Sequence, residues 1–249
     1  MKKILNKILS NFGYKINKTS KGKVVLHSNN TDAYKIQRHL INGYSNELTI
    51  FDIGAYVGDI ALKYNQLFPR STIFCFEPFP DSYSKLEKNT SSFKNIITIN
   101  KGLSEHEGYS EFQINSSAPT NSIFKTDKLS ELRWGKGLLE TIDTIEVEMT
   151  TIDSFVKTES IDKIDILKMD VQGAEYMVLN GAKNTLKKGI VNMIYTEIIL
   201  VPTYEGQIPF EETIKLIKSY GFELFNLYNF SLSKEGQLRQ VDAIFIKSN

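Results

Sequence analysis

The chain has 249 residues, 41% of them hydrophobic and 24% charged, which suits one large folded domain. No run approaches the roughly 20 consecutive apolar residues of a membrane-spanning helix. The single cysteine, Cys75, excludes a disulfide framework and a zinc site of clustered cysteines. The formal net charge of +1 excludes a globally basic nucleic-acid binder, so we expect an ordered cytoplasmic protein with no nucleic acid as partner.

The charge is unevenly distributed along the chain. Residues 1–46 hold nine lysine or arginine residues and one acid, a net charge of +8, and the remainder has a net charge of −7. We expect this basic extension to contain a helix at 2–12, a small strand or loop near 24–26 and a helix over 32–42. The apolar face of residues 2–12 favours packing on its own domain or on a second subunit of an oligomer. Peripheral contact with an anionic membrane is the alternative.

From Leu48 onward, strand-like and helix-like segments alternate. Runs rich in branched and aromatic residues predict strands at 48–55, 71–78, 95–104, 163–173, 191–200, 222–230 and 241–247. Amphipathic segments predict helices at 57–68, 79–93, 174–189 and 210–221. This alternation is typical of an α/β domain, here residues 47–249, with a doubly wound, mostly parallel sheet.

One interval, about residues 104–150, breaks the alternation after the third predicted strand. It contains a polar stretch at 115–145 with the only tryptophan, Trp134, and a further strand-like run follows at 145–156. Long insertions in α/β domains are usually functional loops. We therefore expect residues 115–145 to form a lid on the acceptor side of a binding site. His106 is expected to be a solvated residue in a turn.

Two predicted strands end in residues that suit a nucleoside. The first ends in the segment DIGAYVG (52–58), whose glycines permit a tight turn and close approach of the backbone to a ligand. The second ends in Glu77-Pro78, and a carboxylate there can accept hydrogen bonds from both ribose hydroxyls. Ligands of open α/β sheets bind beyond such strand ends. The predicted cofactor-binding residues are Asp52, Gly54, Ala55, Tyr56, Gly58, Glu77, Pro78, Gly102, Leu103 and Asp170.

The loop does not match a dinucleotide site. Tyr56 and Asp59 stand where the fingerprint G-x-G-x-x-G needs glycine, and Asp52 would repel a pyrophosphate. A cationic ligand with an amino-acid tail fits better, because Asp52 and the loop amides suit its zwitterion and Glu77 suits its ribose. S-adenosylmethionine has these parts, and we predict it as the cofactor.

A second set of acids falls at later strand ends. Asp170 ends the fourth strand, Glu175 lies in the first turn of the next helix, and Glu197 ends the fifth strand, so all three should meet at one rim. A general base for a hydroxyl, ligands of a divalent cation, and a helix cap at Glu175 are three roles open to them. We predict Asp170, Glu197 and Glu175 as catalytic residues, with a divalent cation possible but not favoured. Lys168 has the same orientation as Asp170 along the strand.

Several segments together resemble the FkbM-type S-adenosylmethionine-dependent methyltransferases. They are IFDIGAYVGDIAL, FCFEPFPDSYSKLEKN, VEMTTIDSFV and IDILKMDVQGAEYMVLNGA, in the family's order between residues 49 and 181. The resemblance implies a Rossmann-like class I methyltransferase fold, with seven strands of which one is antiparallel. It also implies O-methylation, often of a sugar or natural product. Two positions depart from the family's pattern. Tyr56 stands where the family usually has Asn or His, and Gln172 stands where it commonly has the first Glu of the motif D-x-E-G-x-E.

The sequence therefore predicts an O-methyltransferase that uses S-adenosylmethionine and acts on a hydroxyl of a sugar, glycan or glycosylated metabolite. One rival is the same scaffold acting on nitrogen or on a protein. Another is a noncatalytic nucleotide-binding partner subunit, against which the acids Asp52, Glu77 and Asp170 argue. Asn121 and Ser122, in the insertion, are further candidates for contact with acceptor or cofactor.

Overall fold

The computed structural model describes residues 14–18, 24–28, 32–41 and 47–248. The chain divides into two compact units, residues 1–42 and 43–249. The helix predicted at residues 2–12, with its subunit or membrane contact, lies outside the described residues.

The first unit contains a two-stranded sheet and one described helix. Strand β1 (Tyr14–Lys18) pairs antiparallel with β2 (Val24–Ser28). Helix α2 (Ala33–Leu40) begins after Asp32, whose side chain accepts a hydrogen bond from the Tyr34 amide at 3.0 Å. The helix predicted over 32–42 is therefore confirmed, with a capping carboxylate at its start.

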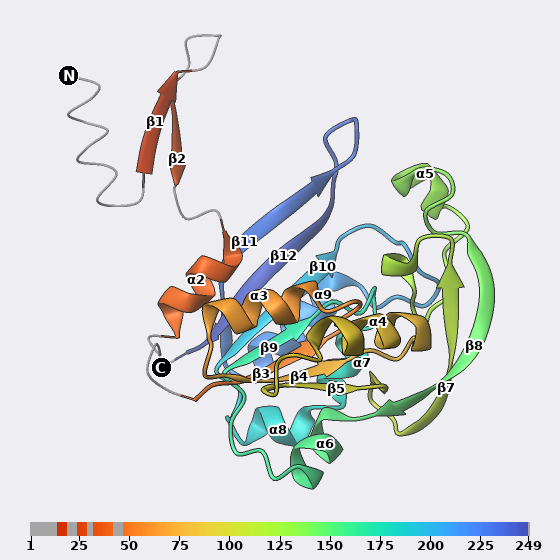
Figure 1. The fold of residues 1–249 in the computed structure, drawn as a ribbon. Helices are drawn as coiled ribbons and strands as arrows, with labels where there is room; N and C mark the ends of the chain where they lie inside the picture. The colour runs from red at the N-terminus through yellow and green to blue at the C-terminus, as the bar shows by residue number, and fades with distance from the viewer. Residues whose placement is uncertain (1–13, 19–23, 29–31, 42–46, 249) are drawn as a thin grey trace. The chain divides into compact units, whose positions relative to one another are not determined.

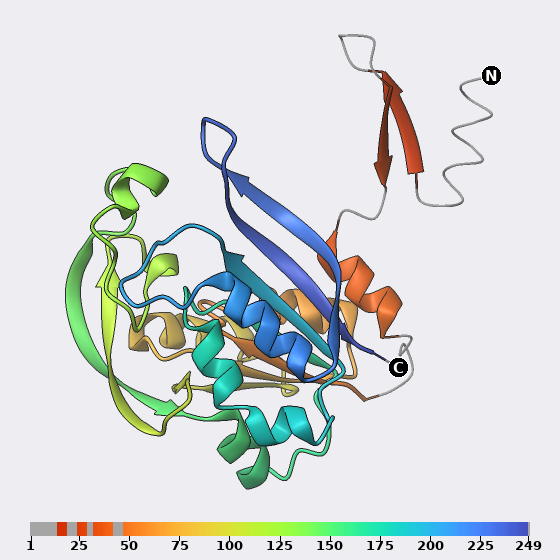
Figure 2. The ribbon, with the colours of Figure 1, turned by 180° about the vertical axis from the view of Figure 1, so that it is seen from behind.

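The second unit is built on a seven-stranded sheet (Figures 1 and 2). Its strands are β3 (Thr49–Ile53), β4 (Thr72–Phe76), β5 (Ile96–Ile99), β9 (Ile166–Met169), β10 (Met193–Ile199), β11 (Phe222–Leu232) and β12 (Leu238–Lys247). They lie in the order β11-β12-β10-β9-β3-β4-β5. All neighbours from β10 to β5 are parallel, and β12 is antiparallel to both of its neighbours. The mostly parallel sheet with one reversed strand is confirmed.

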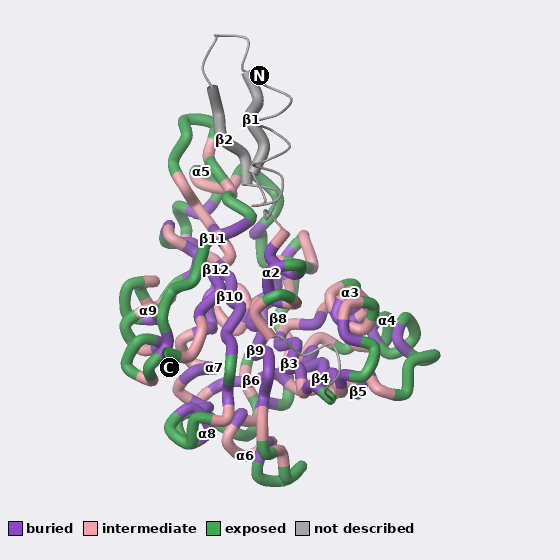
Figure 3. The backbone as a smooth tube through the Cα atoms, turned by 90° about the vertical axis from the view of Figure 1, so that its left-hand side faces the viewer, coloured by how far each residue is buried: buried purple, intermediate pink, exposed green. Residues whose placement is uncertain are grey.

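Helices cover both faces of this sheet (Figures 1 and 2). One face carries α3 (Asp59–Leu67) and α4 (Pro80–Thr90), and the other carries α6 (Ile152–Thr158), α7 (Glu175–Asn180), α8 (Lys183–Lys187) and α9 (Phe210–Ser219). The strands between them are buried almost throughout (Figure 3). On the face of α6, Phe155 packs edge-on against Phe51, Phe74 and Phe76 of β3 and β4. Apolar burial of this kind is the main favourable term in the folding of the layered domain.

Two predicted elements end differently in the structure. The strand predicted at 145–156 ends at Thr150, because the Thr151 hydroxyl accepts a hydrogen bond from the Ser154 amide at 3.0 Å and starts α6. The strand predicted at 95–104 is two strands. Its second part, β6 (Gly102–Leu103), leaves the main sheet.

The insertion forms a small sheet of its own, at the green side of the domain in Figure 1. Strand β7 (Gly108–Asn115) pairs antiparallel with β8 (Thr141–Thr150), and β8 pairs in parallel with β6. The polar stretch between β7 and β8 contains the short helices η1 (Ala118–Thr120) and α5 (Ser130–Trp134). The β7–β8 ladder therefore closes the base of the segment predicted as a lid.

The helix predicted at 174–189 is divided into α7 and α8 around Gly181. A Cβ atom on Gly181 would lie 2.0 Å from the carbonyl oxygen of Ser104, at the end of β6. The absence of a side chain therefore lets the helix pair approach the backbone of the insertion.

We expect Gly181→Ala to lower the free energy of unfolding by about 3 kcal/mol, because the new methyl group collides with a backbone carbonyl that has little room to move. Lys183→Ala, at an exposed position of the same helix pair, should change it by less than about 0.5 kcal/mol. Urea denaturation of both variants measures the difference. Equal stability of the two variants would contradict this close approach.

Candidate active site

A cavity of about 280 Å³ lies at the carboxyl ends of β3, β4 and β9. Most of the predicted cofactor-binding residues line it together. They are Gly54, Ala55, Tyr56, Glu77, Pro78, Gly102, Leu103 and Asp170. The predicted residues Asp52, Gly58, Glu175 and Glu197 do not line it. The parallel strands therefore bring the two predicted motifs to one place, and the side chains of Asp52, Glu175 and Glu197 are buried away from the cavity wall.

The loop after β3 lies directly against the loop after β9. Gly54 has a φ of +73°, and a Cβ atom there would lie 1.9 Å from the carbonyl oxygen of Asp170. Tyr56 also adopts a left-handed conformation, with a φ of +50°, which is uncommon for a residue with a side chain. Gly58 precedes α3 and faces Leu86 rather than the cavity. Strained backbone of this kind persists where the surrounding structure holds it, often at binding sites.

Glu77 is held by backbone amides of two loops. Its Oε2 accepts a hydrogen bond from the Tyr56 amide at 2.9 Å, and its Oε1 accepts one from the Phe79 amide at 3.0 Å. Burial raises the pKa of Glu77 to about 7, although both amides favour the ionised form. Each carboxylate oxygen keeps a further lone pair, which suits recognition of two neighbouring hydroxyls.

Asp52 lies beneath the loop and is fully buried. The Nζ atom of Lys168 is 2.8 Å from Asp52 Oδ1 and donates to the carbonyl oxygen of Gly54 at 2.9 Å. Burial raises the pKa of Asp52, and the Lys168 ammonium opposes that rise. The structure therefore places Lys168, rather than Asp52, at the cavity wall. The position of Lys168 two residues before Asp170 was the sequence signal for this orientation.

Gln172 separates the cavity from Glu197. Its Nε2 donates to Asp170 Oδ1 at 2.8 Å and to Glu197 Oε2 at 3.1 Å, and its Oε1 accepts from the Tyr204 hydroxyl at 3.0 Å. Burial, together with the charges of Asp170 and Glu175, raises the pKa of Glu197 well above its usual value. Glu197 is therefore a buried group behind Gln172, while Asp170 lines the cavity.

Glu175 acts on the loop rather than on the cavity. Its Oε1 accepts a hydrogen bond from the Val171 amide at 3.1 Å and lies 3.4 Å from the Gly173 amide. Burial raises its pKa to about 7. The carboxyl group thus satisfies backbone donors of the loop that precedes α7, whereas no side-chain hydrogen bond caps the first turn of α7 itself.

The insertion supplies one wall of the cavity. Phe112, Ile123 and Met149 contribute apolar surface, and Gly102 approaches Met149 so closely that a Cβ atom would lie 2.5 Å from its sulfur. Asn121 lines the same cavity; its Oδ1 accepts from the Asn115 amide at 2.9 Å, and its buried Nδ2 has no hydrogen-bond partner among the described residues. A buried donor without a partner is costly. The wall therefore offers an apolar slot and one fixed donor to a ligand.

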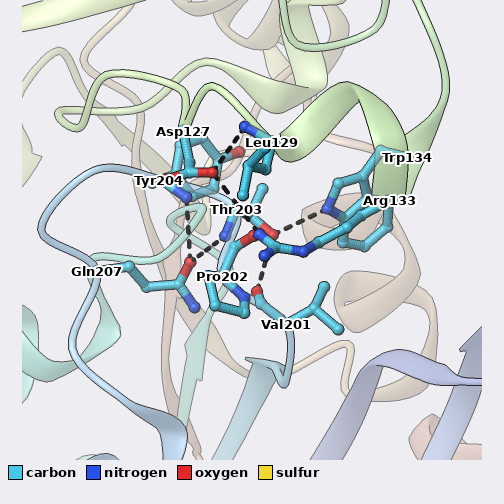
Figure 4. Close-up of polar contacts among 9 residues, drawn as sticks. All are labelled: Asp127, Leu129, Arg133, Trp134, Val201, Pro202, Thr203, Tyr204 and Gln207. Atoms are coloured by element: carbon cyan, nitrogen blue, oxygen red, sulfur yellow. Dashed lines mark hydrogen bonds and ion pairs between the residues drawn. The ribbon is translucent and has the colours of Figure 1, made fainter.

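Trp134 anchors the insertion to the segment that follows β10 (Figure 4). Its Nε1 donates to the Thr203 hydroxyl at 2.9 Å, and its neighbour Arg133 donates to the carbonyl of Pro202. The guanidinium of Arg239 lies 4.6 Å from the centre of the Trp134 ring. Trp134 is thus a contact between α5 and the segment after β10, and it is not among the residues that line the cavity.

Three further findings bear on function. The side chain of His106 is 80% exposed and lies in the turn before β7, as predicted for a solvated residue. Across the described part of the chain, no group of three or more His, Cys, Asp and Glu side chains is arranged to hold a metal ion. No described helix has both the length and the apolar character needed to cross a membrane.

Comparison with known proteins gives consistent matches. The methyltransferase FkbM domain family matches residues 52–224. The 2-O-methyltransferase NoeI of Sinorhizobium fredii is 29% identical over 199 residues, covering 76% of this chain and 79% of NoeI. The methyltransferase sdnD of Sordaria araneosa is 26% identical, covering 70% of this chain and 73% of sdnD. The hexuronic acid methyltransferase AglP of Haloferax volcanii is 26% identical, covering 65% of this chain and 60% of AglP.

The strand order, the glycine loop after β3 and the acid after β4 define an S-adenosylmethionine-dependent methyltransferase of class I. The family match extends over more than half of the sequence, and the chain belongs to the FkbM methyltransferase family. The cofactor fits the residues present, because the carboxyl group of Glu77 lines the cavity, and Asn121, which lines it too, has a buried amide donor without a hydrogen-bond partner among the described residues.

The ion pair beneath the loop gives a stability prediction. Lys168→Met should lower the free energy of unfolding by about 3–5 kcal/mol, because it leaves the Asp52 carboxylate buried without a counter-charge. The double variant Asp52→Asn/Lys168→Met should regain most of that loss, since neither charge remains. Chemical denaturation of the two variants and the parent protein provides the measurement. A double variant no more stable than Lys168→Met would refute the pairing.

Proposed function

We propose that this protein transfers the methyl group of S-adenosylmethionine to a hydroxyl group of a sugar unit, in a glycan or a glycosylated metabolite. The observation that carries the proposal is the placement of Asp170, which lines the cavity beside the glycine loop of the cofactor site. Two relatives support the acceptor class, one named as a 2-O-methyltransferase and the other as a hexuronic acid methyltransferase.

Each part of the cavity has a role in this proposal. The backbone of Gly54, Ala55 and Tyr56 holds the amino-acid tail of the cofactor, and Glu77 binds its ribose hydroxyls. Leu103 and the apolar wall of the insertion enclose the adenine. When bound, the cofactor supplies an activated methyl group on a positively charged sulfur. The protein therefore has mainly to align the acceptor and receive its proton.

Asp170 is the proposed proton acceptor. Its Oδ1 accepts from Gln172, and its Oδ2 accepts no hydrogen bond from the described residues. The acceptor oxygen forms a bond to the methyl carbon, the carbon–sulfur bond breaks with its electron pair remaining on sulfur, and the hydroxyl proton passes to Asp170. Sugar hydroxyls are weak nucleophiles, and a positioned base typically contributes 10²–10⁴-fold to such a step.

The acceptor class is tested by incubating the protein with S-adenosylmethionine and a panel of monosaccharides, uronic acids and oligosaccharides, with matched amines and peptides. Mass spectrometry should find a methyl group added to a sugar oxygen. Transfer confined to amines or peptides would contradict the proposal.

Asp170→Asn should lower turnover by about 10²-fold or more, because the amide cannot take the proton. Glu197→Gln should have a smaller effect, since Glu197 lies behind Gln172 and does not line the cavity. Steady-state kinetics with an acceptor found in the panel measure both. Nearly full activity of Asp170→Asn would contradict the assignment of the base.

The raised pKa of Glu77 predicts a pH dependence of cofactor binding. Without ligand the carboxyl holds its proton below about pH 7, whereas the ribose hydroxyls need its ionised form as a double acceptor. The affinity for S-adenosylhomocysteine should therefore fall as the pH falls, to roughly tenfold weaker at pH 6 than at pH 8. Glu77→Gln, which does not titrate, should bind more weakly at pH 8 and lose this dependence. Calorimetry that finds the same pH dependence in both proteins would exclude Glu77 as its origin.

A further inference from the structure

The side chain of Gln172 lies between two carboxyl groups that come from different strands. Its Nε2 is 2.8 Å from Asp170 Oδ1 and 3.1 Å from Glu197 Oε2. The neighbours of Gln172 fix which end of its amide faces the two carboxyl groups. An Oε1 atom between Asp170 and Glu197 would repel both of them, whereas in the observed orientation Oε1 accepts a hydrogen bond from the Tyr204 hydroxyl. All the hydrogen-bonding capacity of Nε2 is therefore used to join Asp170 to Glu197.

The backbone holds this arrangement under strain. Gln172 has a φ of +53°, a left-handed conformation that is unfavourable for a residue with a side chain. Its carbonyl oxygen accepts a hydrogen bond from the Ser122 hydroxyl at 2.8 Å, which ties the turn to the insertion. Such a conformation persists only where several contacts impose it, and here they direct the amide into the space between the carboxyl groups.

The surroundings of Asp170 are strongly acidic. The carboxyl groups of Asp52, Glu175, Glu197 and Asp242 all interact electrostatically with it, from β3, α7, β10 and β12, and Lys168 is the nearby cation, already paired with Asp52. Two carboxyl groups at such close range repel each other unless a proton, a cation or a hydrogen-bond donor lies between them. In the described structure the donor is the Gln172 amide.

We propose that Gln172 is a positioning residue that takes the place of a divalent cation between Asp170 and Glu197, and leaves the Oδ2 atom of Asp170 directed to the acceptor hydroxyl. The part of this inference that concerns the acceptor hydroxyl rests on the proposed methyl transfer. The part that places the Gln172 amide where a cation would otherwise lie is independent of it. A glutamate at position 172 would bring a third carboxylate to the same point, and three carboxylates are suitable oxygen ligands for Mg²⁺ or Mn²⁺.

The first test measures metal binding and needs no acceptor. Millimolar MnCl2 should leave the melting temperature of the parent protein unchanged and raise that of Gln172→Glu by roughly 3 °C or more, because a ligand that binds the folded state stabilises it. The matched control is Gln113→Glu, a buried glutamine in β7 outside the cavity, which should show no response. Asp170→Asn in the Gln172→Glu background should abolish the response.

A parent protein stabilised by Mn²⁺ through Asp170 would overturn the inference, because a cation and not the amide would then join the pair. A folded Gln172→Glu variant without a manganese response would overturn it as well. Calorimetry with S-adenosylhomocysteine shows whether the variant keeps its folded cofactor site. A failure of this test leaves the methyl transfer itself in place, since neither outcome depends on turnover.

The second test uses Gln172→Met, which keeps the length of the side chain and removes the donor. Asp170 and Glu197 would then share a proton, so the acidic limb of the pH profile for kcat/KM should move upward by about one unit. A purely structural role would lower the rate equally at every pH. An unshifted acidic limb in an active variant would therefore overturn the inference, whereas the shift would support it.

Discussion

Lys168 and Asp52 face each other across the neighbouring strands β9 and β3, where they are direct register partners. The ammonium group compensates a carboxylate that is wholly removed from water, and it also donates to the carbonyl groups of Ile53 and Gly54. A buried charge without such a partner would cost several kcal/mol. This one contact therefore fixes the floor of the cavity, and it joins the cofactor loop to the strand that carries Asp170.

The shape of the cavity follows from that floor. With β3 and β9 held together, the turn at Gly54 lies against the carbonyl of Asp170 with no room for a side chain. The same close packing removes Glu175 and Glu197 from the cavity wall, although they belong to neighbouring strand and helix ends. The insertion completes the site from the other side, because β6 leaves the main sheet and pairs with β8, whose Met149 lines the cavity.

The electrostatics of the site depend on which acids keep water and which lose it. Asp170 and Glu77 line the cavity, and burial raises the pKa of Glu77, Glu175 and Glu197. Each buried carboxyl group is engaged by donors of the chain, which are loop amides for Glu77 and Glu175 and the side chains of Gln172 and Gln240 for Glu197. The protein can therefore concentrate acids at one rim, with Glu77 and Asp170 at the cavity and Glu175 and Glu197 outside it.

The sequence by itself determined the alternating strands and helices, the mostly parallel sheet, and the residues at the strand ends. These features depend on local properties, namely apolar periodicity, glycine in tight turns and acids that follow buried strands. Such properties predicted the cavity residues Gly54, Glu77 and Asp170 and indicated the cofactor. The resemblance to a methyltransferase family rested on the same segments.

The tertiary structure alone decided which side chains of these segments line the cavity. The ion pair of Lys168 with Asp52 and the hydrogen bond from Gln172 to Glu197 join residues that are far apart in the sequence. Their contacts depend on strand register and on backbone turns at positive φ, and neither leaves a periodic pattern in the sequence. The division of the predicted acids into Glu77 and Asp170, which line the cavity, and Asp52, Glu175 and Glu197, which do not, was therefore fixed only by the packing of the strands against each other.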